Sequence, residues 1–469
     1  MLKKIIAYLP STVIPIFINF ILVFIYAGQM EPVEYGIYNV YLNSISIIYA
    51  IALSFLQSSA FRFYSVKGLF NNIKEYYSTY YFSNIIICIL IAIVLLLINF
   101  IFEFDWIVVS TAIALNAFYQ FDINMYRLRD KTGGYAFSRL TASFGALGLI
   151  VVCIALINPI TYKVPIYTFY GAYVLTIIVE FIRCFKSISF KSISKKLFMA
   201  SVRFGMPMMG VTVMGLLMSY TAQYIILFYL SEVSVGYYSL GFRLSDTVIS
   251  NITMIILTVM TPIVMKLYDD VESDNVENSS LMLTKLISLD MWVILPCCAL
   301  LAFYSGDIIR LLFPSYEGAE PIVVIIVFSA ILRSLSMITC KGLELARKTG
   351  KMFLFLVISL AVNIIYMFIF IPIYGIEAAG HASIIAYLIY NIFLIKESYK
   401  YIPIKIDYHY LIKVMIMSAI TVVLALLLSS FIGTGGLALT VVQGSACVLV
   451  YFFGSLLLGL HRPFTGFLA

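Results

Sequence analysis

Charged residues are scarce in this sequence of 469 residues, in which Asp, Glu, Lys and Arg together account for 11%. Soluble domains carry about a quarter of their residues as charged side chains. Hydrophobic residues make up 62% of the chain, and the mean hydropathy is +1.03. These values exclude a water-soluble enzyme. A helix needs about 20 apolar residues to cross a hydrocarbon core, so the composition predicts an all-α polytopic membrane protein.

The usual signs of a catalytic, metal or nucleotide site are also missing. The chain has three histidines and seven cysteines, and the cysteines show no metal-ligand spacing; Cys297 and Cys298 are adjacent. We therefore expect no catalytic residue, no metal site and no disulfide framework. The phosphate-binding pattern G-x-x-x-x-G-K-[ST] does not occur. We expect no cofactor and no nucleic-acid partner, and any activity that needs energy has to draw it from an ion gradient, the membrane potential or consumption of its product.

Long apolar stretches are abundant, and they predict fourteen transmembrane helices. Met1 to Lys4 lead directly into the first stretch without an A-x-A cleavage site, so we expect an uncleaved first helix. The last two spans form one charge-free run, which we divide at residues 433–436. The predicted spans are residues 8–28, 36–61, 76–102, 106–125, 140–162, 164–182, 204–230, 235–265, 286–306, 321–340, 352–374, 378–395, 414–431 and 437–460.

Lys and Arg are distributed unevenly between the two sides of these spans. With the N-terminus inside, the inner loops and termini carry 26 of the 30 basic residues, and the outer loops carry only Lys163 and Arg310. Short loops rich in Lys and Arg stay in the cytoplasm. We therefore expect both termini to be cytoplasmic.

Two weak sequence matches indicate an internal duplication. Residues 34–38 read Glu-Tyr-Gly-Ile-Tyr, and residues 234–238 read Ser-Val-Gly-Tyr-Tyr at the start of a later span. Residues 130–133 and 347–350 share Lys-Thr-Gly in the same helix frame. An even number of helices separates the partners, which predicts two parallel repeats. The expected division is an N-lobe at 1–182, a basic cytoplasmic linker at 183–203, a C-lobe at 204–395, and two extra helices at 396–469.

Three short motifs carry a resemblance to a known family. Residues 34–38, the Ala-Phe-Arg-Phe-Tyr at 60–64 and the Ile-Pro-Ile-Tyr-Gly-Ile-Glu-Ala-Ala-Gly at 371–380 resemble the signatures of Wzx-type O-antigen and capsule flippases. These flippases belong to the multidrug/oligosaccharidyl-lipid/polysaccharide (MOP) exporter superfamily. The resemblance implies two six-helix lobes in a V, as in MATE transporters, with a central cavity and alternating access. Helices 13 and 14 would be an addition that drug exporters usually lack.

Two arginines lie inside predicted spans, where an ionised side chain costs about 2.5–3.5 kcal/mol on insertion scales. Arg333 lies roughly 18 Å along its helix at 1.5 Å per residue, near the membrane middle. Guanidinium groups bind phosphate oxygens bidentately, so Arg333 and Arg243 are candidates for binding a polyprenyl diphosphate. Arg243 could instead neutralise Asp246, one turn later. The alternative for Arg333 is a structural pair with a carboxylate on another helix.

Other candidates lie near the cytoplasmic ends of spans or are uncharged. Arg62 and Lys341 could meet an incoming headgroup or simply anchor their helices. Asp122 and Asp290 are weak candidates for ion coupling; for them and for Glu180, snorkelling or pairing with a nearby base such as Arg183 or Lys285 is the alternative. Polar residues inside spans could line a path for sugars or hydrogen-bond between helices. They are Asn19, Asn43, Gln57, Asn116, Gln120, Gln223 and Asn251.

The expected function is transport of an undecaprenyl-diphosphate-linked oligosaccharide from the cytoplasmic to the outer leaflet, for O-antigen, capsule or exopolysaccharide synthesis. Expected partners are this lipid-linked substrate, membrane lipids, and the polymerase and chain-length proteins of the same pathway. The alternatives are an ion-coupled drug or cation antiporter of the same superfamily, a lipid II flippase, and a membrane-embedded polymerase or glycosyltransferase. The last of these is disfavoured because the longest predicted outer loop, 307–320, is short.

Overall fold

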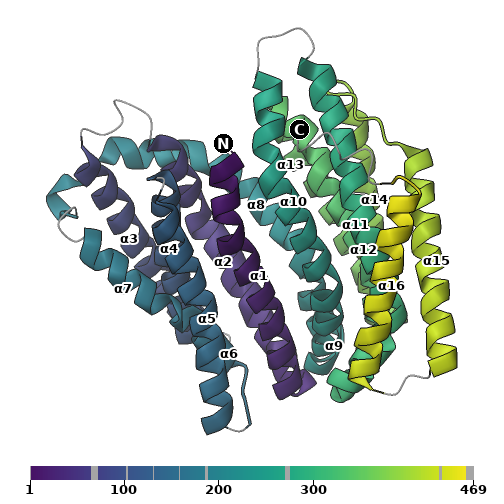
Figure 1. Cartoon of the computed structure of the whole chain (residues 1–469). Helices are drawn as coiled ribbons and strands as arrows, with labels where there is room; N and C mark the ends of the chain where they lie inside the picture. Colours follow the sequence, from purple (N-terminus) through teal and green to yellow (C-terminus); the bar gives the residue numbers. More distant parts are fainter. Residues whose placement is uncertain are drawn as a thin grey trace. The chain divides into compact units, whose positions relative to one another are not determined.

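A computed structural model describes residues 2–64, 72–101, 104–129, 131–157, 159–184, 188–269, 275–432 and 436–460. All regular structure in these residues is helical (Figure 1). Fourteen helical segments are long and apolar enough to cross a membrane. The predicted all-α class and the predicted number of spans are therefore confirmed.

Contacts divide the chain into two compact units, Met1–Tyr220 and Thr221–Ala469. The division lies within the long helix α8. The helices that begin in the first unit are α1 (Leu2–Gln29), α2 (Pro32–Phe63), α3 (Ile73–Asn99), α4 (Trp106–Leu128), α5 (Thr132–Leu156), α6 (Lys163–Gly171), α7 (Tyr173–Cys184), the 3₁₀ turn η2 (Phe190–Ser192) and α8 (Lys195–Tyr229).

The second unit holds the remaining helices and a π-helical turn, η3. They are α9 (Glu232–Phe242), η3 (Arg243–Thr247), α10 (Val248–Asp269), α11 (Asn275–Leu312), the 3₁₀ segment η4 (Pro314–Ala319), α12 (Glu320–Leu345), α13 (Thr349–Tyr374), α14 (Glu377–Ser398), α15 (Tyr408–Ile432) and α16 (Leu437–Leu457). The predicted break at 433–436 falls between α15 and α16, and its residues 433–435 lie outside the described part of the chain.

Several helices extend well beyond the apolar runs that predicted them. α8 begins at Lys195, inside the stretch expected to be a linker, and α11 begins at Asn275 rather than at residue 286. Hydropathy marks the part of a helix that lies in hydrocarbon, whereas backbone hydrogen bonding continues into the charged ends. Residues 185–187 of the expected linker lie outside the described residues, and the expected four-part division of the chain remains a prediction.

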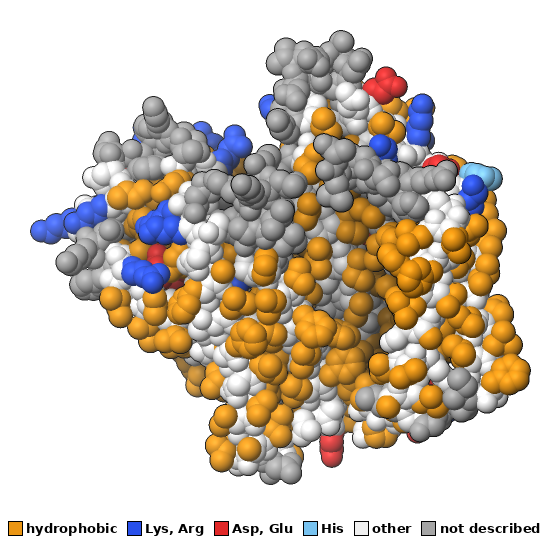
Figure 2. Space-filling model, in the orientation of Figure 1, with side chains coloured by type: hydrophobic (Ala, Val, Ile, Leu, Met, Phe, Trp, Pro, Cys, Tyr) orange, Lys and Arg blue, Asp and Glu red, His pale blue; other side chains and the backbone are white. Residues whose placement is uncertain are grey.

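The helix surfaces match a lipid environment. On the face that Figure 2 shows, hydrophobic side chains cover the middle of the helices, and Lys and Arg lie near helix ends. α3 alone exposes Ile89, Leu90 and Val94, each to more than half of its accessible area. Exposed apolar surfaces of this extent are typical of membrane contact.

Two glycines shape the helices of the second unit. Gly375, in the motif at 371–380, ends α13 with φ at +67°, a conformation that side chains rarely adopt, and its N–H donates to Ile371 O at 2.9 Å. A Cβ on Gly380 would clash with Ile325 of α12. The absence of a side chain at residue 380 therefore allows α14 to pack closely against α12.

Candidate functional site

Asp246 lies in an unusual part of the second unit. The backbone of Arg243–Thr247 forms a π-helical turn, η3, between the α-helices α9 and α10. Such widened turns are rare and frequently occur at functional sites. Ser245, in the same turn, donates a hydrogen bond to Val323 O of α12 at 3.1 Å, which holds η3 against α12. The turn places the Asp246 side chain, which is 7% exposed, beside α12.

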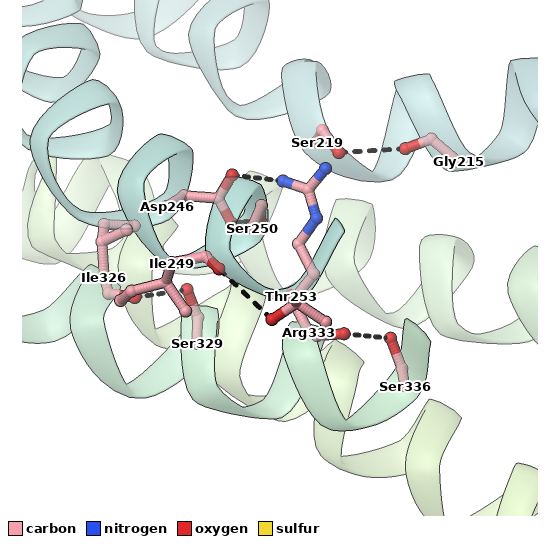
Figure 3. Close-up of polar contacts among 10 residues, drawn as sticks. All are labelled: Gly215, Ser219, Asp246, Ile249, Ser250, Thr253, Ile326, Ser329, Arg333 and Ser336. Atoms are coloured by element: carbon pink, nitrogen blue, oxygen red, sulfur yellow. Dashed lines mark hydrogen bonds and ion pairs between the residues drawn. The ribbon is translucent and has the colours of Figure 1, made fainter. Parts of the chain in front are cut away.

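Arg333 of α12 forms an ion pair with Asp246. One guanidinium nitrogen of Arg333 meets Asp246 Oδ2, and the arginine side chain is 26% exposed (Figure 3). Ser250 Oγ, one turn further along α10, lies 3.4 Å from Asp246 Oδ1. The partner of Arg333 is thus a carboxylate on another element, which was the structural alternative considered from the sequence. The predicted substrate role of Arg333 is a separate matter and stays a prediction.

Asp290 of α11 lies near this pair, but its partners are hydroxyl groups of α10 and α12 and not a cation. Its side chain is completely buried. Thr253 Oγ1 is 2.9 Å from Asp290 Oδ1 and 2.7 Å from Ser334 Oγ, and Ser334 also donates to Asp290 Oδ2. Asp290 is thus buried and held by hydroxyl groups, so the expected snorkelling of its side chain is wrong, and its position near the cytoplasmic interface stays a prediction. Thr253 and Ser334 were not predicted from the sequence.

The pair and the Asp290 cluster both involve α12 and the continuous segment formed by η3 and α10. Ser334 follows Arg333 in α12, and Thr253 follows Ser250 by one turn in α10. A movement of α12 along α10 would therefore change both sets of contacts together. An oxyanion that reaches Arg333 has to compete with Asp246, because a carboxylate and a phosphate use the same N–H donors.

Arg62 and Lys341 occupy different settings at helix ends. Arg62 is exposed at the end of α2, with its guanidinium 4.7 Å from the centre of the Phe204 ring, a cation–π contact. The Lys341 ammonium lies 2.6 Å from Glu344 of the same helix. Lys341 is thus partly neutralised where the sequence allowed either headgroup binding or anchoring.

Five of the seven uncharged candidates lie in the first unit. Asn43 is completely buried in α2, and Asn116 of α4 accepts a hydrogen bond from Gln120 at 3.5 Å. Gln57 of α2 donates to Ala117 O of α4 at 3.3 Å and accepts from Asn124 at 3.2 Å. For Gln57, the interpretation as an interhelical hydrogen-bonding residue is confirmed.

Asp122 and Glu180 are buried in α4 and α7. Glu180 accepts a hydrogen bond from Tyr126 at 2.6 Å, and Arg129 and Arg183 lie 3.6 and 3.7 Å from its oxygens. The expected pairing of Glu180 with Arg183 is therefore confirmed. Asp122 makes no hydrogen bond or ion pair with any residue that the structure describes, and its role in ion coupling remains a prediction.

Metal-type clusters are not found in the described part of the chain, where no three His, Cys, Asp or Glu side chains come together. One basic residue that the sequence analysis counted with the cytoplasmic loops, Arg139, lies inside the helix α5. Only the hydropathy boundary at residue 140 separated it from the predicted span.

Comparisons with known proteins agree with this architecture. Residues 1–268 match the sequence family described as polysaccharide biosynthesis protein. No curated protein matches the sequence. Among solved structures, the lipid II flippase MurJ in an inward closed conformation is similar over 98% of this chain and 99% of that chain, with a TM-score of 0.68 and 16% identity.

Two further structures have the same fold. They are an inward-facing and an outward-facing multidrug resistance MATE family transporter of the MOP superfamily. The inward-facing structure gives a TM-score of 0.65 at 12% identity and covers 82% of this chain and 95% of its own. The outward-facing structure gives 0.61 at 13% identity and covers 85% and 95%. The predicted MATE-like fold is confirmed.

Proposed function

The chain belongs to the polysaccharide biosynthesis protein family, a flippase family of the MOP superfamily, and from this membership we propose that it carries an undecaprenyl-diphosphate-linked oligosaccharide from the cytoplasmic to the outer leaflet. The product would serve O-antigen, capsule or exopolysaccharide synthesis in a bacterial inner membrane, with both termini cytoplasmic. The protein is a multi-pass membrane transporter and not an enzyme.

The family match over residues 1–268 carries the proposal. The similarity to the lipid II flippase over 98% of the chain supports it, because the fold of that protein is shared through α15 and α16. The MATE transporters cover only 82–85% of the chain. This difference favours a lipid-linked substrate over the drug-antiporter alternative.

In the proposed cycle, the diphosphate displaces Asp246 from Arg333. A diphosphate offers more acceptor oxygens than one carboxylate and can take the guanidinium fork bidentately. When substrate is absent, Asp246 is the counter-ion that neutralises Arg333. Arg243, Arg62 and Lys341 are proposed to guide the headgroup, and Asn43 and Asn116 are proposed to contact sugars.

The coupling ion would act through the buried carboxyl groups Asp290 and Asp122. Asp290 is the stronger of the two, because its hydroxyl partners lie on α12, which also carries Arg333, and on α10, which continues directly from the η3 turn of Asp246. Alternating access would bring these helices into a second arrangement. The polymerase and chain-length proteins of the same pathway would receive the flipped product.

The test is mass spectrometry of the lipids that co-purify with the protein in mild detergent. We expect a polyprenyl-diphosphate glycan with the wild-type protein and its loss in Arg333→Ala/Asp246→Ala, which removes both charges and leaves neither unpaired. Arg310→Ala is the matched control, since Arg310 is exposed and pairs with Asp307 of its own helix. Surface polysaccharide in the producing strain should follow the same order. Unchanged polysaccharide after deletion of the gene would count against the proposal.

A further inference from the structure

A small pocket lies inside the first unit, apart from the Arg333 site. It has a volume of about 190 Å³ and is lined by residues of several membrane-spanning helices. The polar and aromatic lining residues are Asn19 of α1, Tyr119 and Gln120 of α4, Arg139 and Ser143 of α5, and Tyr173 of α7. All of them lie in one compact unit, so the pocket does not depend on how the two units are placed.

Arg139 gives this pocket its charge. It lies roughly 10 Å from the start of α5, at 1.5 Å per residue, and so within a membrane span. Its Nε atom is buried and has no hydrogen-bond partner among the described residues. The guanidinium lies 5.8 Å from the centre of the Tyr135 ring. None of the described residues that line the pocket is acidic.

A guanidinium in this position needs an acceptor. Burying a donor without a partner is unfavourable, and more so when the group is charged. The ring of Tyr135 offers a cation–π contact, but such a contact does not satisfy an N–H donor along its bond direction. An oxyanion would satisfy both the charge and the donor, and it is the group that a guanidinium fork binds best.

The volume of the pocket and its other lining residues indicate which ligand it can hold. A volume of 190 Å³ corresponds to about six waters at 30 Å³ each, which suits a phosphate or a carboxylate with part of a sugar. Asn19, Gln120 and Ser143 supply neutral donors and acceptors. Tyr119 and Tyr173 stack with ring centres 3.8 Å apart and an 8° angle between planes, which makes a flat, rigid wall.

We propose that this pocket is an oxyanion-binding site centred on Arg139, for a phosphate or carboxylate group. The assignment of the oxyanion to the transported glycolipid, as its diphosphate or as a sugar acid, rests on the proposed function. Binding of a compact oxyanion does not, and it is tested without any transport measurement.

The experiment uses the full chain in nanodiscs of neutral lipid, with thermal unfolding as the readout. The probes are inorganic phosphate, pyrophosphate and glucuronate, each compared with chloride at equal ionic strength. A ligand that binds only the folded state raises its stability in proportion to RT ln(1 + [L]/Kd). We expect at least one oxyanion to raise the unfolding temperature of the wild-type protein.

Three variants decide whether Arg139 is responsible. Arg139→Gln should lose the oxyanion effect, Arg139→Lys should keep only part of it, and Arg310→Ala should keep all of it. A preference for pyrophosphate points to the lipid diphosphate, and a preference for glucuronate points to a sugar acid. An equal effect of chloride, or an unchanged oxyanion effect in a folded Arg139→Gln, would overturn the proposal. ³¹P line broadening with the same variants provides a second measurement that does not depend on their stability.

Discussion

Two arginines inside membrane spans have opposite surroundings. Arg333 in α12 is ion-paired with the buried carboxylate of Asp246. Arg139 in α5 lines a pocket whose described walls contain no acid, and its Nε has no hydrogen-bond partner there. A cation at membrane depth needs a counter-ion or a cavity. Asp246 is the counter-ion of Arg333. Arg139 has no acidic residue among the described walls of its pocket, so its counter-ion has to come from outside the protein.

The two surroundings correspond to two roles of an arginine side chain: a partner in an ion pair and a direct binding site for an anion. A paired arginine is electrically neutral at rest and binds an anion only by exchanging partners, so its affinity depends on the position of its carboxylate. An arginine without such a partner binds an anion directly. Stability should therefore depend on the pairing of Arg333, and oxyanion binding in the resting protein should depend on Arg139.

Arg333→Ala should have the largest effect on stability. It leaves Asp246 buried without its cation, and breaking a buried pair on one side costs about 3–5 kcal/mol. The free energy of unfolding in mixed micelles measures this loss. Arg333→Ala/Asp246→Ala should recover most of it, and Arg310→Ala should cost only about 0–1 kcal/mol, as exposed pairs do. A loss in Arg333→Ala as small as that in Arg310→Ala would show that the pair is not held in the folded protein.

Asp246→Asn should convert the paired arginine into one that resembles Arg139. The amide still accepts a hydrogen bond from Arg333, so we expect a loss of about 1–3 kcal/mol. The variant should gain a phosphate-dependent rise in unfolding temperature that persists when Arg139→Gln is added. If the double variant shows no response to phosphate, Arg333 is not accessible to anions even when its carboxylate is removed.

Arg139→Met should not lower the free energy of unfolding, because no carboxylate loses its partner, a buried donor without an acceptor is removed, and a chain of similar volume fills the space. The same unfolding measurement, made without added oxyanions, gives the value. A loss comparable to that of Arg333→Ala would identify a structural role for Arg139 and remove the contrast between the two sites.

The sequence predicted the number of spans and the depth of Arg333, because both follow from the apolar runs. It could not identify Asp246 as the partner of Arg333, since the two lie 87 residues apart and meet only through the packing of η3 on α12. The π-helical turn itself has no sequence signature here.

The helical surroundings of Arg139 and Asp290 could not be predicted, for a shared reason. Hydropathy locates the apolar part of a helix and not its ends, so a polar residue beside that part is taken for an anchor in a loop or at the interface. Arg139 precedes the predicted span by one residue, yet α5 already begins at Thr132. Asp290 follows the predicted start of its span at residue 286 by four residues, whereas α11 begins at Asn275 and Asp290 packs against Thr253 and Ser334.

Ser250→Ala should have the smallest effect on the free energy of unfolding. It tests whether the Ser250 hydroxyl helps to hold Asp246 in its pair with Arg333. The Ser250 hydroxyl lies 3.4 Å from Asp246 Oδ1, at the long end of the hydrogen-bond range, so its removal should cost no more than about 0.5–1 kcal/mol. Its loss leaves Asp246 dependent on Arg333 alone. A double-mutant cycle between Ser250→Ala and Asp246→Asn, measured by unfolding, should therefore give a coupling energy close to the single cost of Ser250→Ala. No coupling would mean that the hydroxyl is bonded elsewhere in the helix, and that the Arg333 guanidinium by itself fixes the carboxylate.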